Sequence, residues 1–545
     1  MKLNGDRIKE LTLELVGIKS VVGTRDENLV SERIEEILHT LPYFKENPEH
    51  LFYVENTNDP IGRKSLMAMV KGQKDENSKA VVIIGHIDTV GISDYGDLEE
   101  LATDPLALTE TFKEIELPQR VSEDLQSGNY LFGRGVLDMK SGVSVLMNLL
   151  EEAAKDPMNF SGNLVAAFVS DEEGNSKGML SCVPELVKLK KKHALDYQVA
   201  LDTDYTSTRT LMDPNRYLYA GTVGKLMPSF YIVGKETHVG DPFGGLDSNE
   251  IAAELVRKIN LNVDLSDDVM GEVTVPPVTL RLRDLKPEYS VQTNRDSYVY
   301  FNFATHESTP SMVLDKLMHV ANDAFLDVIE KLNKEYLAFT ARMNLPHKEL
   351  PWISKVYTYD DIFQKVAEKN PGVKEMLDSY AKELLQKSIT DEREISLHLV
   401  KKIHALWGKK DPMIILYFSP PYYPHVAVTG KTEAENTLIN TLKDLSDETL
   451  EKPIRFRKFY PYISDLSYFS LPDEESVTSL KMNMPGFGIS YTLPLDDINE
   501  LSLPVTNIGP YGFDAHQYTE RIEVDYSFYK MPDLVLKTVL KMLEK

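Results

Sequence analysis

Lys79-Ala-Val-Val-Ile-Ile-Gly-His86-Ile-Asp88 is the stretch that decides the fold class. Its apolar, β-branched residues follow one another without alternation, which is typical of a strand buried on both faces of a mostly parallel sheet. Residues 163–169 have the same character, and residues 197–201 predict a third such strand. Residues 143–154, between the first two strands, predict a helix. Strands that alternate with helices predict an α/β fold, with a mixed, mostly parallel sheet between helices.

A different pattern begins near Tyr217. Residues 225–233 and 297–303 predict strands, whereas residues 249–259 and 310–338 predict helices. These elements predict an α+β module that is distinct from the α/β part before it. The helical, charged residues that follow, up to Leu406, carry no recognisable chemistry. An apolar strand is then predicted over residues 413–418, and a strand, loop and helix over residues 503–545.

Composition restricts the class of protein. The chain has 545 residues, which is too long for one ordinary domain. Its hydrophobic content of 42% is sufficient to form a buried core. The formal net charge of −25 disfavours nucleic acid as a partner, because an acidic surface repels phosphates. We find no apolar run long enough to span a membrane and no signal-peptide pattern. The single cysteine, Cys182, fits a reducing compartment, so we expect a cytoplasmic protein.

Two motifs place metal-binding side chains after the first strand. In an open α/β sheet, ligands bind at the carboxyl ends of the strands. Gly85-His86-Ile-Asp88 follows its strand directly, and residues i and i+2 of an extended chain point to the same side. His-x-Asp is commonplace by itself. Gly133-Arg-Gly-Val-Leu-Asp138-Met-Lys-Ser-Gly142 is far more specific than a helix cap requires, and its aspartate is positioned to bridge two metal ions.

Acidic side chains also follow the later strands. Asp171-Glu172-Glu173-Gly174 comes after residues 163–169, and adjacent buried acids need a cation to neutralise them. A metal ion would do so while leaving one carboxylate free as a general base. In Asp202-Thr-Asp204, either aspartate is a candidate ligand, and the distance from the strand favours Asp202. His516 and Glu520 follow Gly509-Pro510, where an ordinary loop histidine is the alternative. Histidine and carboxylate ligands together suit zinc or a related divalent metal ion.

These motifs, in this order, resemble those of metallopeptidase family M20, which includes aminoacylase, bacterial glutamate carboxypeptidase, succinyl-diaminopimelate desuccinylase and tripeptide aminopeptidase. Within the family, the chain is similar to arginine-utilisation proteins of the Roc type. The resemblance implies a zinc-peptidase-like catalytic domain with an inserted α+β lid domain. We therefore expect a first catalytic part at 1–216, the lid at 217–345, a helical extension of open placement at 346–410 and a second catalytic part at 411–545.

The resemblance also implies roles for individual residues. Two divalent metal ions, zinc or alternatively cobalt or manganese, would be held by His86, Asp138, Glu173, Asp202 and His516. Asp138 would bridge both ions, and Asp88 would orient His86. Glu172 would be the general base, taking a proton from water and giving it to the leaving amine. Asp202 stands in Asp-Thr-Asp where relatives commonly have Glu-Pro, so Asp204 remains an alternative ligand.

A second motif, Gly234-Lys-Glu-Thr-His238-Val-Gly240-Asp-Pro-Phe-Gly244, is similar to the lid signature of the family. In relatives this histidine reaches the active site of a partner subunit and stabilises an oxyanion, so the resemblance implies a role for His238 and a homodimer. Asn294 and Arg295 stand where relatives contact the substrate. Without the resemblance, His238 would be an ordinary exposed loop histidine.

The resulting hypothesis is an amidohydrolase or peptidase that cleaves a small amino-acid-derived substrate, including arginine-derived amides. One alternative from another class is a non-catalytic ligand-binding or interaction protein on the same scaffold. A two-metal phosphatase or esterase would use the same physical chemistry. The intact set of candidate ligands favours an enzyme over a binding module.

Overall fold

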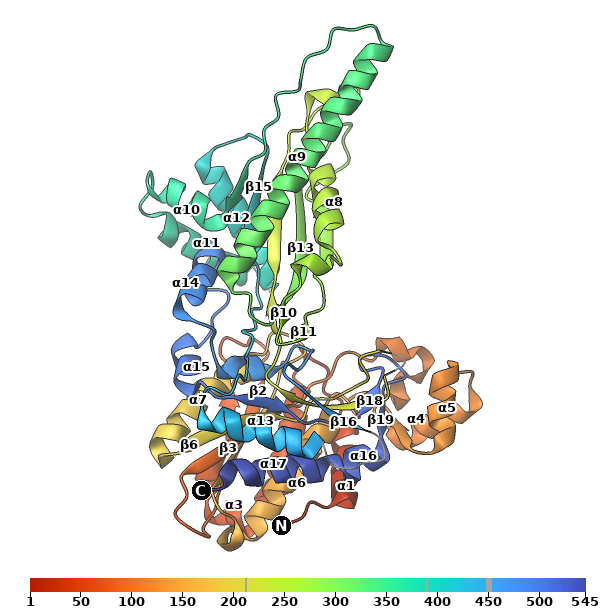
Figure 1. Cartoon of the computed structure of the whole chain (residues 1–545), viewed down its shortest axis with the longest axis vertical. Coiled ribbons are helices and arrows are strands. Elements are labelled where there is room, and N and C mark those ends of the chain that lie inside the picture. Colours follow the sequence, from red (N-terminus) through yellow and green to blue (C-terminus); the bar gives the residue numbers. More distant parts are fainter. Residues whose placement is uncertain (211–212, 388–390, 447–452) are drawn as a thin grey trace. The chain divides into compact units, whose positions relative to one another are not determined.

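The computed structural model describes residues 1–210, 213–387, 391–446 and 453–545. The chain divides into two compact units. Unit 1 comprises Met1–Val223, Val426–Leu471 and Pro494–Lys545, and unit 2 comprises Gly224–His425 and Pro472–Leu493. Each unit has its own main sheet (Figure 1). No helix among the described residues is both long and apolar enough to cross a membrane.

The main sheet of unit 1 has eight strands in the order β1-β2-β5-β3-β6-β17-β7-β16. Their bounds are β1 Leu51–Glu55, β2 Lys64–Lys71, β3 Lys79–His86, β5 Asn163–Val169, β6 Asp196–Asp202, β7 Arg216–Ala220, β16 Ile454–Arg457 and β17 Val505–Asn507. β3 runs parallel to its neighbours β5 and β6, and β6 runs parallel to β17. Every residue of β5 is buried, as its unbroken apolar sequence predicts for a strand covered on both faces. The predicted α/β fold is confirmed.

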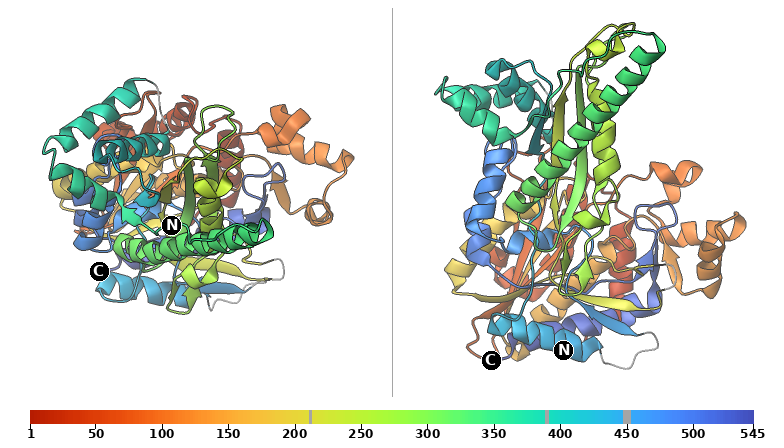
Figure 2. Two further views of the ribbon diagram at one scale, coloured as in Figure 1. Left: turned by 90° about the horizontal axis from the view of Figure 1, so that it is seen from above. Right: turned by 45° about the horizontal axis from the view of Figure 1, so that its top comes forward.

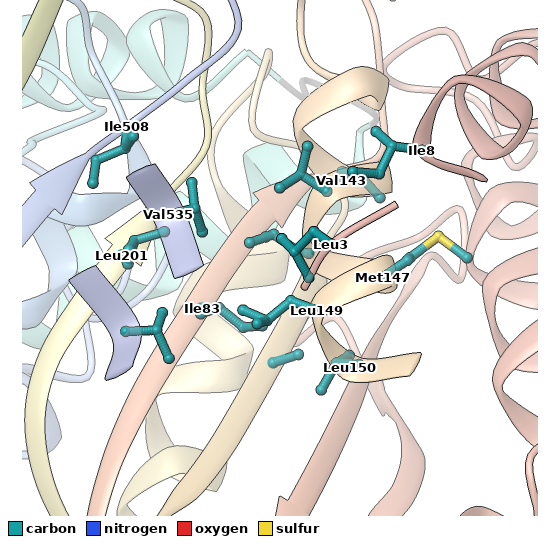
Figure 3. Packing of buried hydrophobic residues seen from close by; sticks show 14 of the residues in the cluster. Leu3, Ile8, Ile83, Val143, Met147, Leu149, Leu150, Leu201, Ile508 and Val535 are labelled. Carbon is teal, nitrogen blue, oxygen red and sulfur yellow. The ribbon is translucent and has the colours of Figure 1, made fainter. Parts of the chain in front are cut away.

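Helices cover both faces of this sheet. α1 Gly5–Val16, α2 Glu27–His39, α6 Lys140–Lys155, α13 Glu433–Ser446 and α17 Met531–Leu543 contribute to one large hydrophobic core. Figure 3 shows Val143, Met147 and Leu150 of α6 in this core, together with Ile83 of β3. Their spacing of three and four residues places them on one face of the helix. α7 Lys177–His193 packs instead against β1, β2 and β5.

A small three-stranded sheet joins two segments that are far apart in the sequence. It contains β4 Tyr130–Phe132, β18 Gly512–Phe513 and β19 Arg521–Glu523, in the order β18-β19-β4. β19 pairs with β4, and Arg521 lies opposite Phe132. The pairing brings the loop that begins at Gly133 beside the loop that carries His516. Shorter helices of unit 1 are α3 Pro42–Glu46, α4 Pro105–Thr111, α5 Gln119–Ser127, α15 Leu495–Leu501 and α16 Val524–Tyr529.

The sheet of unit 2 has the order β12-β13-β9-β15-β14, and β8 also pairs with β13. Its strands are β8 Gly224–Leu226, β9 Pro228–Val233, β12 Val278–Asp284, β13 Asp296–Thr305, β14 Val356–Thr358 and β15 Met413–Phe418. A separate hairpin consists of β10 Asp268–Val269 and β11 Glu272–Val273. The expected second catalytic part, 411–545, differs from the structure at its start, because β15 pairs with β9 and β14 of unit 2. An apolar strand sequence does not specify which sheet the strand joins.

Two groups of helices pack on the sheet of unit 2 (Figure 2). α8 Ser248–Ile259 packs against α9 Pro310–Arg342 and against β9, β12 and β13. α10 Tyr359–Ala367, α11 Val373–Gln386 and α12 Glu392–Trp407 form a hydrophobic core with Tyr231, Tyr298 and Ile415 of the sheet. α14 Glu474–Asn483 packs against α9 and α10. The segment 346–410, whose placement the sequence left open, therefore belongs to unit 2 and covers aromatic residues of its sheet.

Candidate metal centre

The candidate ligands of unit 1 gather at the carboxyl ends of three adjacent strands. His86 is the last residue of β3, and Asp202 is the last residue of β6. Glu172 and Glu173 follow β5 after a short turn. Because β5, β3 and β6 are parallel neighbours, these ends meet at one edge of the sheet.

Asp138 lies between two histidines. Its Oδ1 is 3.0 Å from Nε2 of His86, and its Oδ2 is 3.0 Å from Nε2 of His516. The same nitrogen of His516 lies 2.8 Å from Oε1 of Glu173. One potential ligand atom from each of His86, Asp138 and Glu173 lies within 4.8 Å of the other two. Each oxygen of the Asp138 carboxylate thus faces one of the two histidines.

The chemistry of this donor set fits divalent metal ions. Imidazole nitrogens and carboxylate oxygens are the ligands that zinc, cobalt and manganese accept. Burial lowers the pKa of His516, but hydrogen bonds to Asp138 and Glu173 outweigh it and raise the pKa to about 10. Burial also opposes the charged form of His86, yet the carboxylates around it raise its pKa well above the usual value. The cluster therefore stabilises positive charge strongly, as a cation site must.

Asp202 and Asp204 are both buried at the end of β6, and the structure provides both with partners. Asp202 Oδ2 accepts a hydrogen bond from Ser464 Oγ at 2.8 Å. Asp204 Oδ2 accepts one from the Tyr460 hydroxyl at 2.9 Å. Burial raises the pKa of Asp204 well above its usual value, and the charge of Asp138 is the next cause. For Asp202, burial raises the pKa to about 6, although the hydrogen bond from Ser464 opposes the rise. Both aspartates therefore stay candidate ligands.

Two glycines allow the backbone of residues 203–204 to pack closely against the segments of Gly142 and Gly509. A Cβ atom at Gly142 would lie 2.1 Å from the carbonyl oxygen of Thr203. A Cβ atom at Gly509 would lie 1.7 Å from the carbonyl oxygen of Asp204. Both distances are far below van der Waals contact. Gly142, after Asp138, and Gly509, before His516, are therefore required by their packing against residues 203–204.

Glu172 has the environment of a base. Its side chain is partly exposed. Burial raises the pKa of Glu172 well above its usual value; nearby His86 opposes this shift, whereas Asp465 and Glu173 add to it. A carboxylate with a raised pKa is a stronger proton acceptor than an ordinary one, which suits a general base. Asp465 itself is almost completely buried at the start of the 3-10 helix Asp465–Phe469, and sequence reasoning missed it because a single acid carries no motif.

Asp88 contacts His86 through its main chain. Nδ1 of His86 is 3.0 Å from the main-chain oxygen of Asp88 but 3.8 Å from its carboxylate. The carboxylate instead accepts hydrogen bonds from the peptide N–H groups of Glu172, at 3.2 Å, and Glu173, at 3.0 Å. His86 is thus oriented by the carbonyl of Asp88, which the extended chain brings closer. The side chain of Asp88 holds the loop that carries the two glutamates.

Glu520 is a second supporting residue, and sequence reasoning gave it no role although it stands in the His516 motif. Its Oε1 accepts hydrogen bonds from the peptide N–H groups of Gly135, Leu137 and Asp138, at 2.8, 3.2 and 3.3 Å. Its Oε2 is 2.7 Å from Nη1 of Arg134, the arginine of the Gly-Arg-Gly sequence. Glu520 therefore ties the loop of His516 to the loop of Asp138.

The remaining predicted residues belong to unit 2, and their roles in catalysis stay predictions. His238 is exposed, and its Nδ1 accepts the N–H of Gly240 at 3.0 Å. A neutral His238 therefore carries its proton on Nε2 and can donate it in a hydrogen bond. The amide of Asn294 donates to Ser248 Oγ at 2.8 Å and to Ser297 Oγ at 2.8 Å, which joins α8 to β13. Arg295 forms an ion pair with the neighbouring Asp296 at 3.1 Å.

Comparison with known proteins identifies the family. A model of peptidase family M20/M25/M40 matches residues 82–469. The chain is 35% identical over 547 residues to protein RocB of Bacillus subtilis, with 99% of this chain and 95% of RocB covered. It is 30% identical over 199 residues to succinyl-diaminopimelate desuccinylase of Wolinella succinogenes, with 36% of this chain and 50% of that enzyme covered.

Solved structures agree in fold. A tripeptidase from Staphylococcus aureus aligns over 100% of both chains, with a TM-score of 0.54 and 13% identity. Aminopeptidase PepT from Bacillus cereus aligns over 99% of this chain and 100% of its own, with a TM-score of 0.52 and 11% identity. The extent of the family match and the identity to RocB over nearly the whole chain lead to one conclusion. The chain belongs to peptidase family M20/M25/M40.

Proposed function

We propose that the protein is a dinuclear metal-dependent amidohydrolase or peptidase that acts on small amino-acid-derived substrates. The observation that carries the proposal is Asp138, which faces His86 with one carboxylate oxygen and His516 with the other, next to Glu173. Family membership supports hydrolysis. The names of similar proteins, a desuccinylase and a tripeptidase, support an amide or peptide bond as the one cleaved.

The residues of the centre divide the chemical work. His86, Asp138, Glu173, His516 and one of the two aspartates after β6 would hold the metal ions. Divalent ions, when bound, act as Lewis acids that polarise the scissile carbonyl and acidify water. Glu172 takes the proton from the attacking water at its carboxylate. It then gives the proton to the nitrogen of the leaving amine, which breaks the bond between that nitrogen and the carbonyl carbon.

We propose arginine-derived amides as one substrate class to test first. The support is the similarity to RocB over nearly the whole chain, together with the resemblance to Roc-type arginine-utilisation proteins. The substrate is expected to be a small molecule rather than a nucleic acid, given the net charge of −25. A cytoplasmic location is part of the same proposal, and it rests on Cys182, the single cysteine.

A homodimer is also proposed, in which His238 donates to the substrate oxyanion and Arg295 contacts the substrate. The dimer is supported by β12, an edge strand that pairs with β13 alone among the described strands. Its side chains Val278, Leu280 and Leu282 are 37%, 50% and 47% exposed. An exposed apolar edge strand invites pairing with another chain. A second copy of the chain would cover it.

The proposed activity is tested with a panel of N-acyl amino acids and dipeptides, weighted to arginine derivatives and including phosphate esters. The wild type is loaded with zinc, cobalt or manganese. Glu172→Gln removes the base, and Glu46→Gln, an exposed glutamate, is the matched control. We expect amide hydrolysis by the wild type and the control but not by Glu172→Gln. Hydrolysis of phosphate esters alone would support the phosphatase alternative, and metal binding without any turnover would support the binding module.

A further inference from the structure

A buried cluster of charged residues lies behind the loop that carries Glu172 and Glu173. It consists of Glu27 at the start of α2, Arg63 just before β2, Asp59 and Asp171. Glu27, Arg63 and Asp171 are 0%, 4% and 3% exposed. None of these residues belongs to the predicted ligand set. Charged side chains are rarely buried this completely unless they are paired, so their contacts require an explanation.

Arg63 contacts every acid of the cluster. Its Nε and Nη2 donate to the two carboxylate oxygens of Asp59, each at 3.0 Å. Its Nη1 donates to Glu27 Oε1 at 3.1 Å and to Asp171 Oδ1 at 2.5 Å. One guanidinium therefore orients three carboxylates from three segments of unit 1. Its planar fork of donors makes these contacts possible, which a lysine could not reproduce.

The cluster reaches the loop through its main chain. Glu27 Oε2 accepts the N–H of Asp171 at 2.8 Å. The carboxylate of Asp88 accepts the next two peptide N–H groups, those of Glu172 at 3.2 Å and Glu173 at 3.0 Å. Buried carboxylates thus bind three successive peptide N–H groups. Asp171 has a φ of +67°, a left-handed conformation that a residue other than glycine seldom adopts unless its surroundings fix it.

We propose that Arg63 and Glu27 are positioning residues for the base and for one metal ligand. They fix the peptide of Asp171, and that peptide sets where the side chains of Glu172 and Glu173 begin. The inference rests on the proposed function, because it takes Glu172 as the base and Glu173 as a ligand. Misplacement of a catalytic group by about 1 Å costs about 100-fold in rate, so the geometry of this peptide matters for turnover.

Glu27→Gln is the decisive variant, because it keeps the shape of the side chain. Both carboxylate oxygens of Glu27 accept hydrogen bonds, Oε1 from Gly23 N–H at 2.8 Å and Oε2 from Asp171 N–H. A glutamine offers one oxygen and one NH₂ group, so a donor must face a donor on one side. Glu151→Gln is the matched control. Glu151 is also a buried glutamate of unit 1, but its carboxylate accepts hydrogen bonds from Arg7 at 2.9 Å and from Asn148 at 3.0 Å, which lie outside the cluster.

The test measures kcat, KM and zinc affinity of the full-length variants, each corrected for the folded fraction. We expect Glu27→Gln to lower kcat by about 100-fold with KM unchanged. It should also lower the affinity for one zinc ion, the ion held by Glu173, by about 10–100-fold. Glu151→Gln should lower the melting temperature but leave kcat and both zinc affinities as in the wild type.

Two results would overturn the inference. The first is a kcat and a zinc affinity of Glu27→Gln that equal those of the wild type. The second is an equal loss of kcat and zinc affinity in both variants, which would indicate a structural role only. Failure of the proposed function gives a different result. The wild type would then hydrolyse no substrate, while Glu27→Gln would still lower the affinity for one zinc ion. In that case the positioning of Glu173 stands and the hydrolase proposal does not.

Discussion

Glu520→Gln is the change whose effect the structure predicts most fully. Glu520 is completely buried, and its two oxygens serve different partners. Oε1 accepts the N–H groups of Gly135, Leu137 and Asp138, whereas Oε2 faces Arg134 at 2.7 Å. A glutamine has one oxygen, so its NH₂ group must face either Arg134 or the peptide N–H groups. In both orientations a donor meets a donor, and one set of contacts is lost.

The size of the effect follows from these contacts. A buried donor that loses its acceptor costs about 1–3 kcal/mol. Because about 1.4 kcal/mol corresponds to a factor of ten, the loop of Asp138 should be misplaced often enough to weaken metal binding by about 5–150-fold. Supporting residues of metal sites contribute about 10–100-fold in affinity, which lies within that range. Arg134 keeps its ion pair with Asp94, at 2.9 Å, so folding should survive the change.

The assay is competition for zinc between the protein and a chelator of known affinity. Glu110→Gln is the control, because Glu110 pairs with Lys113 on the surface, and its side chain is 71% exposed. Exposed pairs contribute about 0–1 kcal/mol, and this one does not contact the centre. Zinc affinity in Glu520→Gln equal to that of the wild type and of Glu110→Gln would refute the argument that Glu520 holds Asp138 in place.

The other predictions concern pH, the choice of ligand and the subunit interface. In the metal-free protein, His516 has a pKa raised from 6.5 to about 10, so its contribution to stability is complete below pH 6.5 and is lost as the pH rises through 10. The melting temperature should fall over that interval, and no such fall in the wild type relative to His516→Gln would contradict the assignment. Zinc titration should show a larger loss of affinity in Asp204→Asn than in Asp202→Asn, because the charge of Asp138 acts on Asp204. The reverse order would identify Asp202 as the ligand. Light scattering should show a dimer that Leu280→Asp converts to a monomer, and a dimeric variant would exclude β12 from the interface.

The elements that sequence reasoning located best are those whose surroundings fix their composition. β3 and β5 are covered on both faces, so their unbroken apolar sequences gave their bounds, Lys79–His86 and Asn163–Val169. The residues at the ends of these strands were found for the same reason, because the end of a buried parallel strand is where a site is built. His86 and Glu173 therefore lie together in the structure as expected.

Other features depend on contacts between segments that are far apart in the sequence. β15 has the same apolar character as β3, yet it joins the sheet of unit 2, because strand composition does not specify a partner. The Arg63 cluster joins residues 27, 59, 63 and 171, and each is an ordinary charged residue when read alone. Asp88 contacts His86 through its carbonyl rather than its side chain, because two residues of extended chain bring the carbonyl closer. Geometry of this kind requires the folded chain.

The measurement that tests the central claim most directly is turnover of an amide substrate as zinc is added to the metal-free protein. The wild type and Glu172→Gln are titrated side by side, and bound zinc is measured in each. Our account predicts that wild-type activity rises until two zinc ions are bound per chain, whereas Glu172→Gln binds the same zinc without turnover. Full activity without metal, or wild-type turnover by Glu172→Gln, would contradict a dinuclear hydrolase in which Glu172 moves the proton.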